Sequence, residues 1–232
     1  MFPYYYDPSY FLCAALALII TMFAHFRVQH MFKKYSKIKT KKNITGMQSA
    51  KDILVQNNVE SIKISRINGD FNDHFDPRKN MISLSNSVHS KSSIAAVSVA
   101  AHEAGHSVQH ATKYGFIRVR QGLVPVTRVC STLAMPLVFI GLMLPVQYSF
   151  MVNLGIILFS VAVLFQLVTL PVEFDASHRG IAALTNSGNY TEEELHGAKK
   201  VLNAAAMTYV AALFTSLITL LRLIFLASRR RR

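Results

Sequence analysis

The chain has 232 residues, 51% of them hydrophobic, and a mean hydropathy of +0.29. These values are high for a soluble domain and predict segments that span a lipid bilayer. The formal net charge of +13 fits loops that face anionic lipid on the cytoplasmic side, and nucleic-acid binding is not expected. The two cysteines, Cys13 and Cys130, lie in separate apolar runs, so a structural disulfide is not expected.

Residues 1–26 are predicted to form an N-terminal membrane anchor, whose apolar part is residues 11–24. No basic residue precedes this run, and a segment rich in lysine, residues 27–42, follows it. A cleavable signal peptide has the opposite charge order. The sequence therefore predicts a retained anchor with its N-terminus outside the cell.

Residues 27–128 are predicted to form a cytoplasmic zincin-like region. Residues 45–58 have helical spacing, with Thr45 or Ser49 as the N-cap. Residues 61–65 and 81–85 alternate between apolar and polar side chains and predict two strands. We expect the second strand to lie at the edge of its sheet, where it could pair with an extended peptide.

Residues 92–111 are predicted as a helix capped by Ser92 or Ser93, and this helix contains a His-Glu-x-x-His box. Positions i and i+4 share one face of a helix, so His102 and His106 can bind the same metal ion. Glu103 follows the first histidine and can reach a water molecule on that metal. Two nitrogen ligands, an open coordination position and a carboxylate base are the minimum for a zinc hydrolase.

Residues 129–172 contain no charged residue and no histidine, and they predict a transmembrane hairpin with its turn at 144–148. Residues 173–203 are predicted to form a helix and loop that supply the third metal ligand. Residues 204–232 predict a C-terminal membrane segment with a basic tail. A simple crossing would put the terminal arginines outside, so this segment is tilted, re-entrant or interfacial, or else violates the positive-inside tendency.

Two candidates compete for the third ligand position. His110 lies eight residues after His102, and a straight helix carries it about 6 Å beyond His106, too far to share one ion. A turn back toward the metal would need a glycine where Gln109 stands. Glu173 is the first acid after the hairpin and is the better candidate. Asp175 lies about 200° further round a helix, so we expect it to support the site or to be solvated.

Several sequence blocks resemble one known family. They are DHFDP at 73–77, AAHEAGHSVQH at 100–110, LPVEFDAS at 170–177 and AAAMTYVAA at 204–212. In these blocks the chain resembles the YugP-type bacterial membrane zinc metallopeptidases and, more distantly, gluzincins of the HtpX and CAAX prenyl protease types. The resemblance implies bound Zn2+ and a third ligand from a Glu-x-x-x-Asp motif. Glu173 matches the glutamate, but Ser177 stands in place of the aspartate, which leaves open what supports the ligand histidine.

The sequence thus predicts a mainly α integral membrane protein with a small α+β zincin-like domain and about four membrane segments. We expect a zinc endopeptidase of the cell membrane that hydrolyses polypeptide substrates at the cytoplasmic face, with Glu103 as general base. Candidates that could support the ligands or stabilise the oxyanion are Asp175, Ser177, His178, Arg179 and Tyr209.

The alternative function is a non-enzymatic membrane scaffold or regulator that is stabilised by zinc. The presence of Glu103 beside the ligands argues against it, because structural zinc sites usually have four protein ligands and need no base. The sequence does not indicate an oligomeric state.

Overall fold

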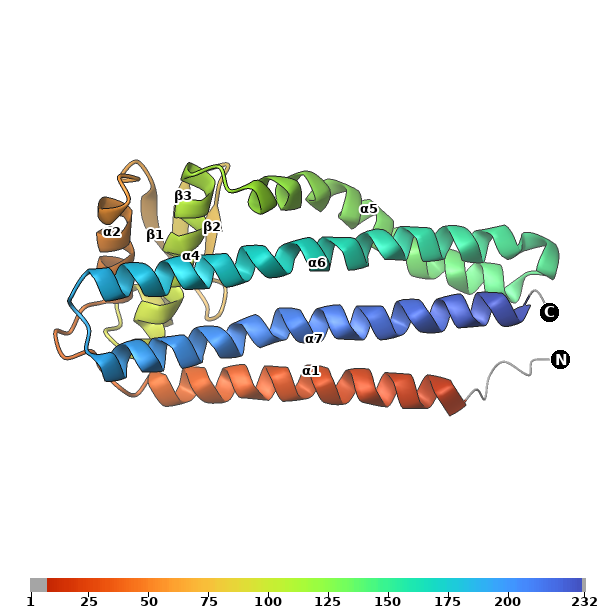
Figure 1. The fold of residues 1–232 in the computed structure, drawn as a ribbon, viewed down its shortest axis with the longest axis horizontal. Helices are drawn as coiled ribbons and strands as arrows, with labels where there is room; N and C mark the ends of the chain where they lie inside the picture. Colours follow the sequence, from red (N-terminus) through yellow and green to blue (C-terminus); the bar gives the residue numbers. More distant parts are fainter. Residues whose placement is uncertain (1–7, 231–232) are drawn as a thin grey trace. The chain divides into compact units, whose positions relative to one another are not determined.

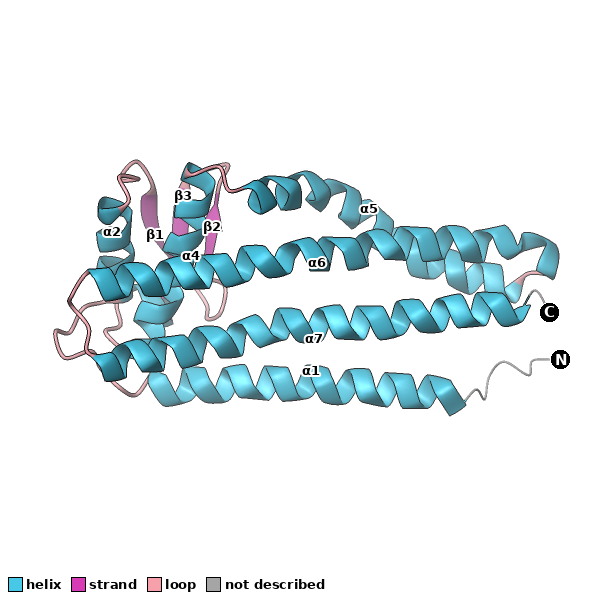
Figure 2. Ribbon diagram, in the orientation of Figure 1, coloured by secondary structure: helices cyan, strands magenta, loops and turns pink. Residues whose placement is uncertain are grey.

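The computed structural model describes residues 8–230. Helices make up most of the described chain, and one small sheet accompanies them (Figure 2). Four helices within the described residues are long and apolar enough to cross a membrane. The protein is therefore a mainly α membrane protein with a small α+β part, as predicted. The first seven residues of the predicted anchor and the last two arginines lie outside the described residues.

The four long helices follow the apolar runs of the sequence (Figure 1). They are α1 (Pro8–Tyr35), α5 (Gly115–Met143), α6 (Ser149–Asn186) and α7 (Glu192–Arg230). A 3-10 turn, Val146–Tyr148, separates α5 from α6 and lies within residues 144–148, where the sequence places the turn of the hairpin. Many large apolar side chains on these helices are exposed, as expected for a surface that faces lipid.

The long helices extend beyond the membrane segments that the sequence predicts. Helix α1 continues past the predicted anchor into the basic segment and carries Lys33 and Lys34 in its last turn. Helix α7 is uninterrupted, which is inconsistent with a re-entrant loop in its apolar part. The boundaries of the predicted segments stay predictions.

The chain divides into two compact units. One, the membrane unit, comprises residues up to Ala24, Val119–Leu170 and the residues from Thr208. The other, the site unit, comprises His25–Arg118 and Pro171–Met207. The site unit contains the sheet, the short helices and the His-Glu-x-x-His box.

Helix α2 (Gly46–Gln56) begins at the cap that the sequence predicts. The Thr45 hydroxyl accepts a hydrogen bond from the backbone N–H of Gln48 at 3.2 Å, and Gln48 Oε1 accepts one from the Thr45 N–H at 2.8 Å. This reciprocal capping box satisfies two donors that the first helical turn leaves free. The apolar face of α2 then packs into the core through Ala50, Ile53 and Leu54, all buried as expected.

The sheet has the strand order β1-β3-β2, with β1 (Lys63–Ile67), β2 (His74–Asp76) and β3 (Met81–Ser85). Strand β3 pairs in parallel with β1 and antiparallel with β2, so it is central. The predicted edge position of residues 81–85 was wrong. Its alternating polar residues are serines, Ser83 and Ser85, which are small enough to be buried alongside Ile82 and Leu84. The sequence did not reveal β2, because three residues with one apolar side chain give no clear period.

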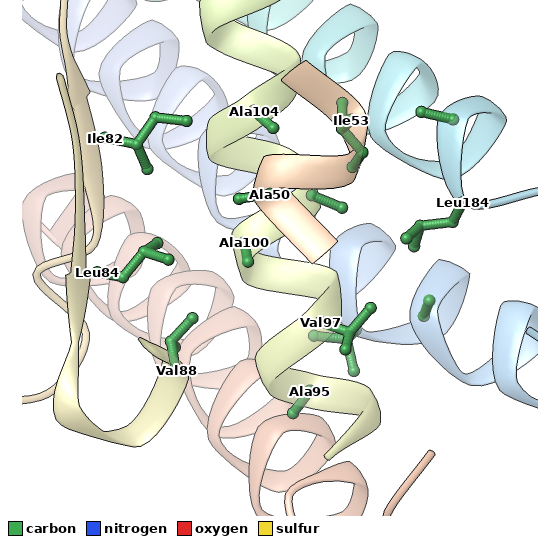
Figure 3. Close-up of a cluster of buried hydrophobic side chains, with 14 of the residues drawn as sticks. Ala50, Ile53, Ile82, Leu84, Val88, Ala95, Val97, Ala100, Ala104 and Leu184 are labelled. Atoms are coloured by element: carbon green, nitrogen blue, oxygen red, sulfur yellow. The ribbon is translucent and has the colours of Figure 1, made fainter. Parts of the chain in front are cut away.

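Helix α4 (Ile94–Ala111) runs through the core of the site unit, preceded by the short helix α3 (Asn86–His89). Ser93 caps it, with its hydroxyl accepting a hydrogen bond from the Ala96 N–H at 3.2 Å. Small side chains cover most of α4, so neighbours can pack on several sides (Figure 3). These neighbours come from α2, β3, α3 and α6, and include Ala50, Ile53, Ile82, Leu84, Val88 and Leu184.

Helices α4 and α6 approach each other so closely that two glycines are required. A Cβ added to Gly105 of α4 would collide with the carbonyl oxygen of Ala176. A Cβ added to Gly180 of α6 would lie 2.6 Å from the carbonyl oxygen of Ala101. Both clashes are with backbone atoms, which cannot move aside as a flexible side chain can. The box helix and the start of the predicted third-ligand region therefore touch backbone to backbone.

Replacing Gly105 with alanine is expected to lower the free energy of unfolding by about 1–3 kcal/mol or more, because the new methyl group forces α4 and α6 apart. The measurement is the unfolding of the purified protein in detergent. Gly115→Ala is the matched control, because a Cβ at Gly115 meets nothing within 4 Å. Alanine there is expected to leave stability unchanged or to raise it by up to ~1 kcal/mol. Equal losses in the two variants would contradict the close approach.

Candidate metal centre

Three side chains in the site unit meet at one point, and they are the predicted ligands. His102 and His106 project from one face of α4, and Glu173 projects from α6. Glu173 Oε2 lies 3.3 Å from Nε2 of His102 and 3.6 Å from Nε2 of His106. The three candidate ligand atoms all lie within 4.8 Å of one another. Two imidazole nitrogens and one carboxylate oxygen are a donor set that catalytic zinc sites use, so the residues fit this ion.

The burial of these groups supports a cation at the same point. The Glu173 side chain is only 2% exposed, and the two histidine side chains are 16% and 11% exposed. A carboxylate buried this deeply needs a positive partner. Burial by itself lowers the pKa of His106, but its contact with Glu173 and the charges of Glu103 and Glu173 outweigh burial and raise that pKa. The site thus favours positive charge, which a divalent cation supplies.

Glu103 lies beside the ligands on α4 and is 8% exposed. Its negative charge is one of the causes that raise the pKa of His106, so the carboxylate is electrostatically coupled to the ligand cluster. The cluster does not include Glu103 as a ligand. A buried carboxylate next to a three-ligand site, and outside its donor set, is placed as a proton acceptor would be.

Each candidate ligand histidine has a second contact through its other ring nitrogen. His102 Nδ1 lies 3.0 Å from Ser177 Oγ, so the serine at the position of the aspartate in the gluzincin motif contacts this candidate ligand. His106 Nδ1 lies 3.0 Å from Oε1 of Gln109, which is fully buried. Such contacts orient metal ligands and set which nitrogen faces the metal. Gln109 is not among the site residues that the sequence predicts, where it appears only as the residue in place of a glycine.

The other residues considered for the site lie outside the cluster of His102, His106 and Glu173. Arg179 Nε donates a hydrogen bond to Asp175 Oδ2 at 2.6 Å, and its guanidinium lies over the ring of Tyr114. His178 is exposed on α6. Tyr209 belongs to the membrane unit, and its candidacy stays a prediction. His110 is not part of the ligand cluster, and its ring instead lies 5.7 Å from that of Phe75.

Comparison with known proteins gives a consistent result. The model of the family described as "Putative neutral zinc metallopeptidase" matches residues 10–228 of this chain. A protein of Bacillus subtilis (strain 168) described as "Putative membrane protease YugP" is 43% identical over 215 residues. That similarity covers 92% of this chain and 95% of the Bacillus protein. No solved structure matches the chain.

Replacing Glu173 with alanine is expected to abolish stoichiometric zinc binding, because only two of the three ligand atoms remain. The measurement is the zinc content of the purified protein, accompanied by its sensitivity to limited proteolysis. His110→Ala is the matched control, since it removes a histidine from the same helix outside the cluster. Zinc that stays with Glu173→Ala and leaves with His110→Ala would contradict the ligand set.

Proposed function

The chain belongs to the family described as "Putative neutral zinc metallopeptidase", and we propose that it is a gluzincin-like endopeptidase embedded in the cell membrane. In this proposal it hydrolyses peptide bonds of polypeptide substrates at the cytoplasmic face. The observation that carries the proposal is Glu103, a buried carboxylate beside His102, His106 and Glu173 that is not itself in the ligand set. A purely structural zinc site has no use for such a base.

The proposed reaction divides its tasks among these four residues. His102, His106 and Glu173 would hold the zinc and leave one position open. A zinc ion bound there would supply Lewis acidity and lower the pKa of a water ligand to about 7. Glu103 accepts the proton of the attacking water and delivers it to the nitrogen of the leaving amine. Its low exposure keeps bulk water from competing for that proton.

The charge that develops on the peptide oxygen needs a further donor. Arg179, His178 and Tyr209 are the proposed candidates. The Nε of Arg179 already donates to Asp175, so this arginine would act through its terminal nitrogens. Ser177 and Asp175 are proposed to support the ligands, because Ser177 contacts His102 and Asp175 contacts Gln109, which in turn contacts His106.

The cytoplasmic location is proposed from the distribution of charge. Most of the 25 lysine and arginine residues lie in residues 27–128, whereas the α5–α6 turn has none. Positively charged segments next to membrane helices stay on the cytoplasmic side. An N-terminus outside the cell and a first crossing by α1 then put the site unit inside.

Replacing Glu103 with glutamine is expected to lower the rate of cleavage of an unfolded polypeptide by about 10²–10⁴-fold, because the base is lost. Zinc content is expected to stay unchanged, since all three ligands remain. Glu60→Gln, which neutralises an exposed glutamate of the same unit, is the matched control and should cleave at the wild-type rate. Undiminished cleavage by Glu103→Gln would contradict the mechanism. A zinc-loaded wild type that cleaves no polypeptide would favour the scaffold function instead.

The orientation can be tested by labelling single cysteines in a chain without Cys13 and Cys130. Lys79→Cys places an exposed thiol in the β2–β3 turn of the site unit, and Gln147→Cys places one in the exposed α5–α6 turn. A membrane-impermeant maleimide added to intact cells should label the cysteine at 147 and should not label that at 79. Inverted vesicles should give the reverse result. Labelling of position 79 in intact cells would contradict a cytoplasmic site.

A further inference from the structure

Gln109 contacts both of the helices that carry the ligands. It lies three residues after His106 on α4 and is fully buried. Its Oε1 is 3.0 Å from His106 Nδ1, and its Nε2 donates to the carbonyl oxygen of Val172 at 2.8 Å and to Asp175 Oδ2 at 2.7 Å. We propose that Gln109 is a positioning residue with two effects. It directs His106 Nε2 toward the metal, and it fixes the position of Glu173 along the axis of α6 relative to α4. The inference rests on the proposed zinc site.

The partners of the Gln109 amide determine its orientation. A backbone carbonyl oxygen can only accept a hydrogen bond, and an ionised carboxylate can only accept as well. The NH2 group must therefore face Val172 and Asp175. The opposite orientation would put the amide oxygen against two acceptors in a buried place, where it would have no donor. Arg179 strengthens this constraint, because its Nε donates to the same Asp175 oxygen and holds it in position.

The orientation of the amide then decides the state of His106. Its Oε1 faces Nδ1 and can only accept, so Nδ1 must carry a hydrogen and donate it. In a neutral imidazole the other nitrogen, Nε2, is then left with its lone pair. That nitrogen is the one that lies 3.6 Å from Glu173 Oε2 in the ligand cluster. One amide thus selects the tautomer that can bind a metal through the nitrogen facing the site.

The two NH2 contacts also bracket the third ligand. Val172 immediately precedes Glu173, and Asp175 follows it by two residues. A slip of α6 by one residue would move these acceptors about 1.5 Å along the helix axis and turn them about 100° away. Both hydrogen bonds would then be lost together. Gln109 therefore favours the one register of α6 against α4 in which Glu173 reaches the two histidines.

The test measures the zinc affinity of the full-length protein in detergent, by competition with a chromogenic chelator. Gln109→Met keeps the length of the side chain and removes its amide, and it is expected to weaken zinc binding about 10–100-fold. The matched control is Gln166→Met, which removes an amide that donates to Ser216 Oγ at 2.8 Å in the membrane unit. This control is expected to bind zinc as the wild type does.

An isosteric variant tests the direction of the hydrogen bonds. In Gln109→Glu the new carboxylate can still accept from His106 Nδ1, but it cannot donate to Val172 or Asp175. It is expected to weaken zinc binding at least as much as Gln109→Met does. A purely space-filling role for Gln109 predicts wild-type affinity, because glutamate fills the same space. As a readout without mutation, 15N spectra of zinc-loaded wild type should show His106 coordinated through Nε2 and protonated at Nδ1.

Four results would overturn the inference. They are wild-type zinc affinity in Gln109→Met, an equal loss in Gln166→Met, wild-type zinc affinity in Gln109→Glu, and coordination of His106 through Nδ1. The spectra decide the matter even if Gln109→Met does not fold. Failure of the proposed function would look different: wild-type protein that binds zinc without cleaving polypeptides removes the enzyme and keeps Gln109 in its role. Wild-type protein that binds no zinc removes both.

Discussion

The close approach of α4 and α6 is the constraint on which the site depends. The third ligand lies 67 positions after the second in the sequence, and only direct contact between these helices brings them together. That contact requires Gly105 and Gly180, because a side chain at either position would collide with the opposite backbone. Small residues are thus as necessary to the site as the ligands, although they take no part in the chemistry.

Such tight packing leaves little room for water, so the polar groups between the helices must satisfy one another. Two buried serines of α4 do so within their own helix, where Ser98 donates to the carbonyl of Ile94 and Ser107 to that of Ala104. His102, His106 and Gln109 instead contact polar groups of α6. Gln109 can make its contacts because an amide both donates and accepts hydrogen bonds. An apolar side chain could do neither here, and an ionised carboxylate could only accept.

The candidate metal ligand on α6 belongs to a helix that also contains a membrane-length apolar run. Helix α6 is uninterrupted from Ser149 to Asn186, and Pro171 within it ends no helix. One helix therefore carries both the apolar residues up to Leu170 that belong to the membrane unit and Glu173, which belongs to the site unit. The buried charged cluster lies beside the hydrophobic core of the site unit, to which Ala101 and Ala104 of α4 belong.

Local patterns in the sequence were sufficient for several features. The spacing of His102 and His106 predicts a shared helix face, and uncharged runs of sufficient length predict membrane helices, because each pattern depends on residues close together in the sequence. The sequence left Thr45 and Ser49 open as the cap of α2, and the structure shows that the cap is Thr45. Only the tertiary structure decided the features that depend on contacts between distant segments. It made β3 a central strand, since burial of its serines depends on what covers them, and it gave Gln109 partners on α6 at positions 172 and 175. Hydrogen bonds between distant residues leave no period in a single sequence, so the candidate ligands could be named in advance, while Gln109, which contacts one of them, could not.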